Sequence, residues 1–496
     1  MITHMAASLA LSAGGNATIY LGANNVHGEV PSPAVVLLGV TPTLPGCEAL
    51  CCAQDGNATH PCRSFTWHHP DFPKPQYASR CYAHTDYAWA PVAQSQIDSG
   101  LRFALPPTPP PTPPGWVCAK DADCSGYNGA CTAGACACRP GWAGATCGQV
   151  KFVAGSARKA FESDLWTWGA SPIVDAASGA VHLFASQLSA DCGILHYCSN
   201  SHVVHLVAPS GDALGPYETR EIALPPSAPP AWDSGATHGV SVHALPRGVN
   251  ASWPRYALFY MGTRNTWDPA HGTHPNCTAA YDANTGDRGS RRIGVATSDS
   301  LDGPWRRRDA PIFGPGNRSA GEWDFGDESN PTPIVNPDGS VVLLYKGRGG
   351  STQAVGVATA PAFDGPYNRS KSHGQLGGED PWGWIDPSSG TYHAFAHDGN
   401  GALGAGGHGW SVDGVTWTYT HIAYTGNVTW QNGSALVLAR RERPQVLLAR
   451  PNTTGGSTGV PEYLFTAAQD CLPKTDGGPG TDGCRTYTMV EQIDLS

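Results

Sequence analysis

The chain is poor in charged residues and contains no long apolar run. Only 14% of its 496 residues are charged, and the formal net charge is −10. An acidic protein has no electrostatic attraction to phosphate backbones, so we expect no nucleic-acid partner. No stretch approaches the roughly eighteen consecutive apolar residues of a transmembrane helix, so we expect no membrane span. The 61 glycines and 43 prolines instead favour a turn-rich β protein over a helical one.

Five short runs repeat one pattern between residues 171 and 463. Each places a polar residue at a turn, usually beside proline, and continues into a strand: Ser171–Val174, His238–Val242, Asn330–Val335, Glu379–Trp384 and Glu442–Val446. A second apolar strand follows each of them: Val181–Ala185, Tyr256–Met261, Val341–Tyr345, Tyr392–Ala396 and Tyr463–Thr466. A Gly-Pro-aromatic turn then closes three of the units, at residues 215–217, 303–305 and 365–367. Repeated units of short strands predict a mainly β fold with a five-bladed β-propeller over residues 160–496.

The first strand of each blade lines the axis of a propeller. One polar residue at or next to the start of each run therefore points towards one shared central funnel, and we expect these residues to form a site: Ser171, His238, Asn330, Glu379 and Arg443. Five unlike polar side chains at one place favour a binding or catalytic role over a purely structural one.

Cysteines and glycosylation sequons indicate the secretory pathway. The chain has 16 cysteines and nine Asn-X-Ser/Thr sequons, at Asn16, Asn57, Asn250, Asn276, Asn317, Asn368, Asn427, Asn432 and Asn452. Met5–Ala13 is a short apolar stretch without a basic flank, so no signal peptide is evident in these residues. We nevertheless expect a secreted or extracellular glycoprotein, at a cell surface or in a matrix.

A proline-rich segment separates two parts of the chain. We expect residues 106–115 to form a semi-rigid polyproline linker. The next segment, residues 116–149, carries six cysteines with the spacing C-x5-C-x6-C-x4-C-x-C-x8-C and ends in a Gly-Trp-x-Gly turn. This segment resembles an EGF-like module. The resemblance implies the pairs Cys118–Cys131, Cys124–Cys136 and Cys138–Cys147, whereas spacing alone leaves fifteen connectivities open.

The segment before the linker contains a second cysteine-bearing pattern. After a lead of residues 1–16, residues 17–105 include Cys47-Glu48-Ala49-Leu50-Cys51-Cys52, the strand-like Cys62–Trp67, Arg80–Tyr82 and Ser99–Leu101. This region resembles a PAN/apple domain, an α+β module. The resemblance implies a cysteine-bearing helix bridged to a strand, and extracellular proteins or carbohydrate as partners.

The remaining cysteines leave alternatives open. Cys192–Cys198 and Cys471–Cys484 are close enough in sequence to pair locally. Cys277 and one of Cys51 or Cys52 then remain. They either bridge the two domains or stay free or intermolecular, and the sequence favours neither.

Residues 160–496 resemble the five-bladed propeller glycoside hydrolases of family 43 and its relatives. The resemblance rests on Gly294–Ser298 leading to Gly303-Pro304-Trp305, on its echo at residues 356–367, on Gly407–Trp417 and on Arg441–Pro444. It implies a five-bladed fold and a catalytic set of three carboxylates: a base before proline in blade 1, an acid-tuning aspartate before proline in a middle blade, and an acid two residues before proline in blade 4.

Only one of these three positions carries a carboxylate. Glu379 occupies the acid position with Asp380 beside it, but Ser171 and Asn330 stand at the other two. Glycoside hydrolysis needs a carboxylic acid and a facing carboxylate, so the catalytic set is degenerate. Nearby substitutes are Asp327, Glu328, Asp164, His238 and His408, although Asp near Gly or Pro more often forms turns and a propeller His is more often scaffold. We take Glu379, Asp380 and Asp327 as the candidate catalytic residues.

Aromatic residues flank the same motifs. Trp168, Trp382 and Trp384 could stack on sugar faces or could pack between blades. Arg443 could grip an anionic sugar or pair with Glu379 or Asp380. The predicted substrate-binding set is Trp168, Ser171, His238, Asn330, Trp382, His408 and Arg443, and the predicted partner is a polysaccharide or a glycoprotein glycan. We expect no cofactor and no metal site.

Two function classes follow. The first is a secreted glycan-directed propeller that binds a sugar, with hydrolysis left open. The second is a non-catalytic structural glycoprotein of an extracellular matrix, cell wall or surface appendage. If the first holds with catalysis, Glu379 should be protonated near neutrality, because Asp380 and an indole wall would both raise its pKa. If Arg443 instead reaches Glu379, binding or a structural role is favoured.

Overall fold

The structure is a computed structural model. It describes residues 117–188, 193–264, 291–349, 352–397, 406–449, 459–470 and 485–496, together with the backbone of seven strands between residues 17 and 102. The chain divides into two compact units, one of residues 1–108 with 472–476 and the other of residues 109–471 with 477–496. The boundary falls inside the predicted linker.

The first unit is described through its strands alone. Five strands form a sheet in the order β1-β7-β4-β5-β3, and β2 pairs with β6. Their bounds are β1 Ala17–Tyr20, β2 Ala23–Asn24, β3 Val35–Val40, β4 Ser64–His68, β5 Arg80–His84, β6 Val92–Ala93 and β7 Ile97–Arg102. The strand-like motifs of the PAN/apple resemblance are therefore strands, while the expected cysteine-bearing helix lies outside the described residues. The PAN/apple identity stays a prediction.

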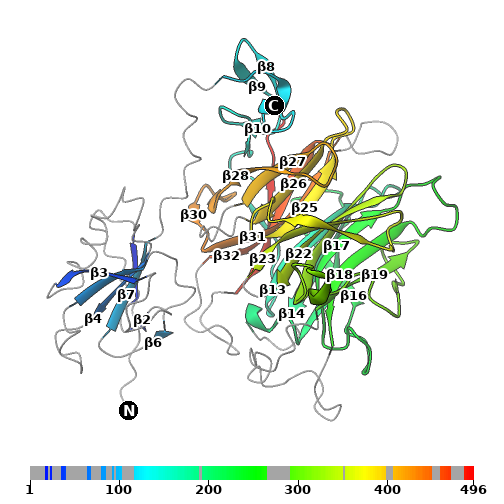
Figure 1. The fold of residues 1–496 in the computed structure, drawn as a ribbon, viewed down its shortest axis with the longest axis horizontal. Coiled ribbons are helices and arrows are strands. Elements are labelled where there is room, and N and C mark those ends of the chain that lie inside the picture. The colour runs from blue at the N-terminus through cyan, green and yellow to red at the C-terminus, as the bar shows by residue number, and fades with distance from the viewer. Residues whose placement is uncertain are drawn as a thin grey trace. The chain divides into compact units, whose positions relative to one another are not determined.

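The second unit contains five four-stranded antiparallel sheets, so the predicted five-bladed propeller is confirmed (Figure 1). Blade 1 consists of β13 Thr167–Val174, β14 Val181–Leu188, β15 Ser201–Ala208 and β16 Glu218–Leu224. Blade 2 consists of β17 Ala236–Ala244, β18 Tyr256–Thr263, β19 Arg292–Ser298 and β20 Arg306–Arg307. Blade 3 consists of β21 Asp327–Val335, β22 Val341–Gly349, β23 Thr352–Ala360 and β24 Asn368–His373. Blade 4 consists of β25 Glu379–Ile385, β26 Tyr392–His397, β27 Gly406–Ser411 and β28 Thr418–Tyr424.

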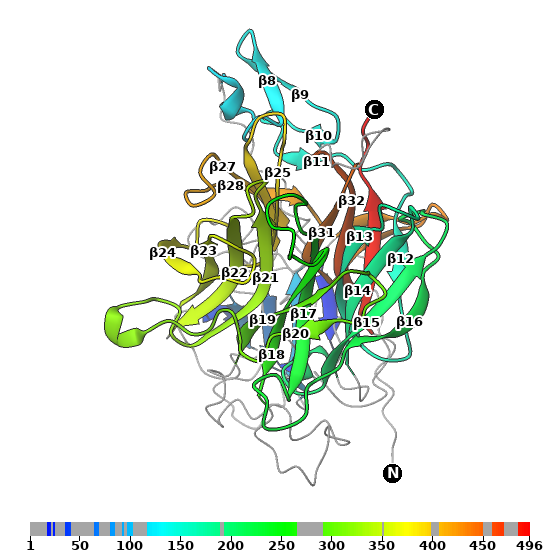
Figure 2. The ribbon, with the colours of Figure 1, turned by 90° about the vertical axis from the view of Figure 1, so that its right-hand side faces the viewer.

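The fifth blade joins both ends of the propeller segment. It has the order β12-β33-β32-β31, with β31 Arg440–Leu448, β32 Pro461–Gln469 and β33 Tyr487–Gln492. Its outermost strand, β12 Arg158–Phe161, precedes blade 1 in sequence, so the propeller begins slightly before the predicted residue 160. Two further short strands, β29 Asn427–Thr429 and β30 Ala435–Val437, pair between blades 4 and 5. The first strands contact one another around a closed ring, β13, β17, β21, β25 and β31 (Figure 2).

Each blade is held to the next by an apolar layer. Between blades 1 and 2, for example, Phe184 and Val203 pack against Leu258, and all three are fully buried. Strands covered on both faces lose the polar alternation of a half-exposed sheet, which is why β14, β15 and β18 are apolar or small along most of their length. The layers fix the relative positions of the five first strands, and those strands carry the candidate site.

The cysteine-rich segment packs directly on the propeller. It comprises the 3₁₀ turn η1 Asp121–Asp123 and the hairpins of β8 Gly129–Thr132 with β9 Ala135–Cys138 and β10 Trp142–Ala143 with β11 Gln149–Val150. Its disulfides are Cys118–Cys131, Cys124–Cys136 and Cys138–Cys147, the pairs that the EGF resemblance implies. The identity of the module as EGF-like stays a prediction.

Contacts with blade 4 hold this module in place. The indole of Trp142 lies 4.7 Å from the ring of His408 and 5.9 Å from that of Phe395, measured between ring centroids. Arg139 forms an ion pair with Asp386 at 3.0 Å. Gly126 lies so close to Trp410 that a Cβ there would stand 2.2 Å from its Cγ. The module and blade 4 therefore form one packed structure.

Other helical turns are short. In the part of the chain that the structure describes, they are η2 Ile194–His196 and η5 Arg318–Ala320. Within the described residues, no helix has the length and apolar character needed to cross a membrane.

Candidate functional site

Each first strand carries a β-bulge at the same place, and the bulge defines the centre of the propeller. The register shifts at residues 168/170, 238/241, 329/332, 379/382 and 442/445. One residue in each bulge has a positive φ: Gly169 (66°), Gly239 (64°), Asn330 (52°), Asp380 (53°) and Arg443 (51°). A left-handed conformation suits glycine and is costly for arginine. Three non-glycine residues held this way by the surrounding blades indicate a functional centre.

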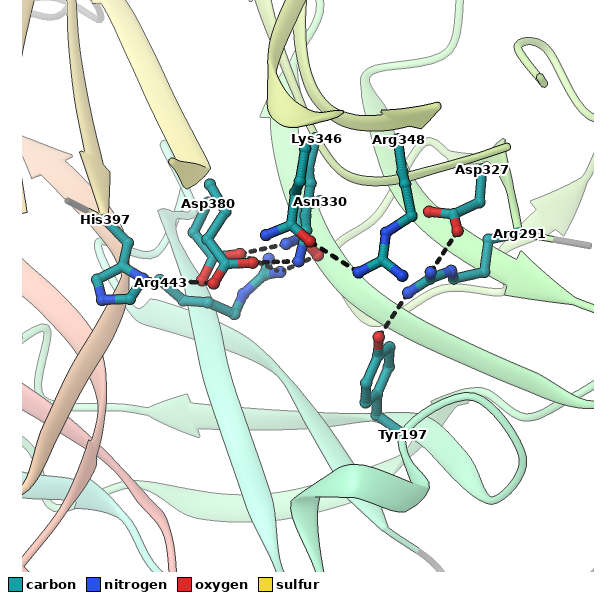
Figure 3. Close-up of polar contacts among 11 residues, drawn as sticks. Tyr197, Arg291, Asp327, Asn330, Lys346, Arg348, Asp380, His397 and Arg443 are labelled. Atoms are coloured by element: carbon teal, nitrogen blue, oxygen red, sulfur yellow. Dashed lines mark hydrogen bonds and ion pairs between the residues drawn. The ribbon is translucent and has the colours of Figure 1, made fainter. Parts of the chain in front are cut away.

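The three bulge side chains form one hydrogen-bonded group (Figure 3). Arg443 Nη1 donates to Asn330 Oδ1 at 2.8 Å and lies 3.7 Å from Asp380 Oδ1, and the Asn330 amide donates to the same Asp380 oxygen. The Arg443 side chain extends across the two glycine bulges, since a Cβ on Gly169 or on Gly239 would stand 3.1 Å from it. Asp380 and Arg443 are both buried. Arg443 thus occupies the space where blades 1 and 2 carry no side chain.

Glu379 belongs to a second group beside the first. Its carboxylate is ion-paired with Lys346 of β22, and its Oε1 lies 3.5 Å from His397 Nδ1. Residue 397 is the direct cross-strand partner of residue 379. Glu442 of β31 offers a carboxylate oxygen within 4.8 Å of ligand atoms of both Glu379 and His397. His397 therefore lies between two carboxylates.

These neighbours determine the protonation of Glu379. Burial alone would raise the pKa of Glu379, but the Lys346 ammonium and His397 lower it well below its usual range. The expectation of a protonated Glu379 is wrong. That expectation considered only the neighbouring tryptophans and the like charge of Asp380. It did not include the cationic groups of Lys346 and His397, which come from second strands.

Asp380 is the carboxyl that holds its proton more tightly. Burial raises the pKa of Asp380 to about 6, with Arg443 opposing the shift and Glu379 adding to it. The adjacent carboxyl groups therefore have pKa values displaced in opposite directions. Arg443 pairs with Asp380, one of the two partners that the sequence allowed, and not with Glu379.

A third polar group continues from the same centre (Figure 3). Arg291 donates to the Tyr197 hydroxyl and to Asp327 Oδ2, both at 2.5 Å. Asp327 is fully buried. Its carboxylate forms an ion pair with Arg291, so Asp327 serves as a counter-ion and does not act as a free base.

Solvent reaches only one part of this arrangement. Asn330, Lys346, Arg348 and Glu379 are half-buried, whereas the side chains of Asp380, His397, Glu442 and Arg443 lie beneath them. A ligand arriving at the axis meets an amide, two cations and a carboxylate. Such a set donates and accepts hydrogen bonds over a small area, as recognition of a polyhydroxylated ligand requires.

The predicted polar residues of blades 1 and 2 are hydrogen-bonded to neighbouring strands, although the His238 ring also lies 5.2 Å from the ring of Tyr197, measured between centroids. Ser171 stands two residues after the bulge, where its hydroxyl accepts from the backbone N–H of Val242, so it joins two blades and does not face the centre. His238 is buried and hydrogen-bonded to Ser201 at 2.8 Å, and burial lowers its pKa far below the usual value. Neither has the predicted ligand-facing role.

The predicted aromatic ligands are packing residues. Trp382 and Trp384 lie in the apolar layer between blades 4 and 5, and His408, also completely buried, contacts Trp142 and His393. Trp168 is 6% exposed and packs against Trp166 and Ile194. Side chains enclosed in these layers have no free ring face for a sugar, which corrects the predicted stacking.

The two other substitute carboxylates differ in burial, and Glu328 is excluded as a base. Asp164 is exposed in the loop between β12 and β13. Glu328 is completely buried, and burial together with Asp324 raises its pKa to about 9 despite Arg369 at 3.7 Å. A carboxyl that stays protonated at neutral pH cannot accept a proton from water.

The cysteine predictions have mixed outcomes. Cys198 carries a free thiol whose pKa is raised by burial, so the predicted Cys192–Cys198 bridge is not formed. Cys471, Cys484, Cys277, Cys51 and Cys52 lie outside the described residues. Five sequon asparagines are described, and all are exposed as glycan attachment requires: Asn250, Asn317, Asn368, Asn427 and Asn432. The sequons at Asn16, Asn57, Asn276 and Asn452 lie outside the described residues.

A metal ion could be shared by three neighbouring side chains, those of Glu379, His397 and Glu442. Their negative charge is already neutralised by the Lys346 ammonium and by the proton on His397. Lys346 pairs with Glu379. Burial alone would lower the pKa of His397, yet Glu442 and Glu379 raise it to about 9. A histidine that is cationic at neutral pH is a poor metal ligand. Cys118, Cys124 and Cys136 also lie close together, but disulfides occupy them.

Comparison with known proteins leaves the family open. No family model matches the chain, and no curated protein matches it. Solved structures similar to it include a family 117 glycoside hydrolase of the marine bacterium Zobellia galactanivorans, with 16% identity, 70% of this chain and 91% of that chain covered, and a TM-score of 0.49. An α-L-arabinofuranosidase of Podospora anserina in complex with cellotriose has 12% identity, coverage of 67% and 99%, and a TM-score of 0.40. A thermostable family 43 glycoside hydrolase has 13% identity, coverage of 66% and 89%, and a TM-score of 0.39. Similarity at this level assigns no activity.

Sequence reasoning missed the residues contributed by second strands. Lys346 and His397 lie on the second strands β22 and β26, whereas the residues proposed from the sequence come from first strands, from loops and, for His408, from the third strand β27. A shared signal was present, because Asn330, Asp380 and Arg443 all immediately precede proline. Aligning the blades on that proline places Asp380, not Glu379, level with Asn330 and Arg443.

The buried His397 predicts a pH dependence of stability. Its pKa is about 9 in the folded chain and about 6.5 when unfolded, so its stabilising contribution is complete below pH 6.5 and is lost as the pH rises through 9. The free energy of unfolding should fall over this range by up to about 3 kcal/mol more in the native protein than in His397→Gln. Chemical denaturation at pH 6.5 and at pH 9 measures the difference.

His243→Gln is the matched control. Burial lowers the pKa of His243 to about 4, so this histidine does not titrate in the same range. Glu328 changes the free energy of unfolding with pH in the same direction as His397. It is present in all three proteins, so its contribution cancels when their pH slopes are compared. Equal pH slopes in the native protein and His397→Gln would contradict the prediction.

Proposed function

We propose that this protein is an extracellular glycan-binding propeller that recognises a sugar at its axis and does not use Glu379 as a general acid. The observation that carries the proposal is the pairing at the centre: Lys346 and His397 keep Glu379 ionised, and Arg443 extends over Gly169, where blade 1 offers no carboxylate. Hydrolysis needs a proton donor and a facing carboxylate. Among the described residues, the centre offers polar groups for binding, but Glu379 does not hold a proton and no carboxylate stands at Gly169.

The glycan as ligand class is supported by two features. The sequence motifs resemble those of family 43 propellers, and the half-buried groups at the axis combine an amide, a carboxylate and two cations. The nine sequons and the disulfides support an extracellular location. The five exposed sequon asparagines fit the same location.

Binding measurements on arabino-, xylo- and galacto-oligosaccharides test the proposal. We expect calorimetric binding without release of reducing sugar. Arg348→Ala should weaken binding about tenfold or more, because a hydrogen bond to a charged group contributes about 1.5–3 kcal/mol. Arg318→Ala is the matched control, since Arg318 lies in η5 away from the central network.

Other outcomes would overturn the proposal in distinguishable ways. Turnover that Glu379→Gln abolishes would establish a hydrolase. Turnover that survives Glu379→Gln and is lost in Asp380→Asn would assign the proton to the carboxyl whose pKa is raised. The absence of both binding and turnover would favour a structural glycoprotein, a role that the close packing of the disulfide module on blade 4 also suits.

A further inference from the structure

Two buried histidines lie side by side in blade 1, and neither of them belongs to the central site. His182 is on β14 and His205 is on β15, at diagonal positions of the antiparallel ladder. His182 Nδ1 and His205 Nε2 are 2.8 Å apart, and the two rings are nearly parallel. They are 4% and 0% exposed. A polar pair in an otherwise apolar layer needs a reason, because burying polar groups costs free energy.

Two carboxylates complete the cluster. Glu221 on β16 is directly opposite His205 in the ladder, with its Oε1 4.0 Å from His205 Nδ1. That buried nitrogen has no hydrogen-bond partner among the described residues. Asp302 comes from the turn between β19 and β20 of blade 2, where it is exposed. One potential ligand atom from each of His182, His205 and Asp302 lies within 4.8 Å of the others.

We propose that His182, His205 and Asp302 bind a divalent transition-metal ion such as Zn²⁺ and thereby link blade 1 to blade 2. Two imidazoles and one carboxylate form a ligand set that zinc accepts, with water in the fourth position. Zinc–nitrogen bonds of about 2.0–2.1 Å in a tetrahedral site place two nitrogens roughly 3.3 Å apart. The two ring nitrogens therefore need to separate by only about half an ångström to admit the ion.

The protonation states favour the ion. Burial lowers the pKa of both histidines, that of His205 to about 4, so both rings are neutral at pH 7. Glu221 favours a proton on His205 Nδ1, which leaves Nε2 free to coordinate, as carboxylates behind metal-bound histidines do. His182 then needs only to move its proton from Nδ1 to Nε2, so binding releases no proton. Arg220 adds an unfavourable positive charge, but it is paired with Glu218 at 3.2 Å.

Calorimetric titration of the full-length protein with Zn²⁺, after treatment with a chelator, tests the site. We expect the native protein to bind one more equivalent than Asp302→Asn, and Glu221→Gln to lose about 10–100-fold in affinity at that site. Zn²⁺ should also raise the melting temperature of the native protein but not that of Asp302→Asn. With Co²⁺ as a probe, the visible absorption of a low-symmetry site should appear only where Asp302 is present.

Asp364→Asn is the matched control. Asp364 stands before the Gly-Pro-aromatic turn of blade 3, as Asp302 does in blade 2, and its partner is the exposed Arg308. It should bind Zn²⁺ like the native protein. Because Asp302 is exposed, its replacement should not disturb folding, whereas His205→Gln could. Equal stoichiometry in the native protein and Asp302→Asn, or no Zn²⁺ binding by either, would overturn the proposal.

Discussion

Replacing Arg443 by methionine should lower the free energy of unfolding by about 3–5 kcal/mol, because it leaves a buried carboxylate without its cation. The side chains of Arg443 and Asp380 are each 5% exposed and lie 3.7 Å apart. Asn330 loses its donor as well, since Arg443 Nη1 bonds to its Oδ1. Urea denaturation at pH 7 measures the change.

Two comparisons isolate the cause. Arg308→Met removes one half of an exposed pair with Asp364, with side-chain exposures of 50% and 35%, and should cost about 0–1 kcal/mol. Adding Asp380→Asn to Arg443→Met should recover much of the loss, because the uncompensated charge disappears. A loss below about 1 kcal/mol in Arg443→Met would show that Asp380 carries no uncompensated charge at pH 7, because it takes up a proton or is solvated by water.

Replacing Trp142 by alanine should have an effect of similar size, about 3–5 kcal/mol. The indole is buried between the disulfide module and blade 4, against Phe395 and His408. The disulfides keep the module itself folded, so the loss should appear as detachment. Hydrogen exchange of the Lys151 amide, which donates to Gly141, and of the β27 amides should accelerate.

Val117→Ala provides the control for this experiment. Val117 belongs to the same module but is 68% exposed, so its truncation should leave exchange and stability unchanged. If Trp142→Ala exchanged at the native rate, the module would be held by Arg139–Asp386 and by backbone contacts, and the indole would be dispensable.

The blade pattern was readable from the sequence because it is local. A strand, a turn and a second strand lie close together in the sequence, and Val181–Ala185 and Tyr392–Ala396 fall inside β14 and β26 as predicted. The closing strand β12 was not predicted, since nothing within residues 158–161 identifies a partner as distant as β33.

The site was only partly readable because register determines it. A bulge shifts the pairing by one residue, and a one-residue shift decides whether Glu379 or Asp380 stands level with Arg443. The partners of Glu379 come from other strands, so its neighbouring residues Asp380 and Trp382 suggested the opposite direction of its pKa. The sequence also did not reveal that Trp384 and His408 are buried, because tryptophan and histidine occur in ligand sites as well as in cores.

The closure of the ring through β12 has a consequence for synthesis in the cell. Ser156 Oγ donates to the Gln492 carbonyl, 336 residues further along the chain. The earliest propeller strand, β12, therefore cannot pair until β33 (Tyr487–Gln492) has been synthesised, and its edge stays unpaired until then. A chain that stopped before residue 487 would lack β33 and would leave β12 without its ladder partner.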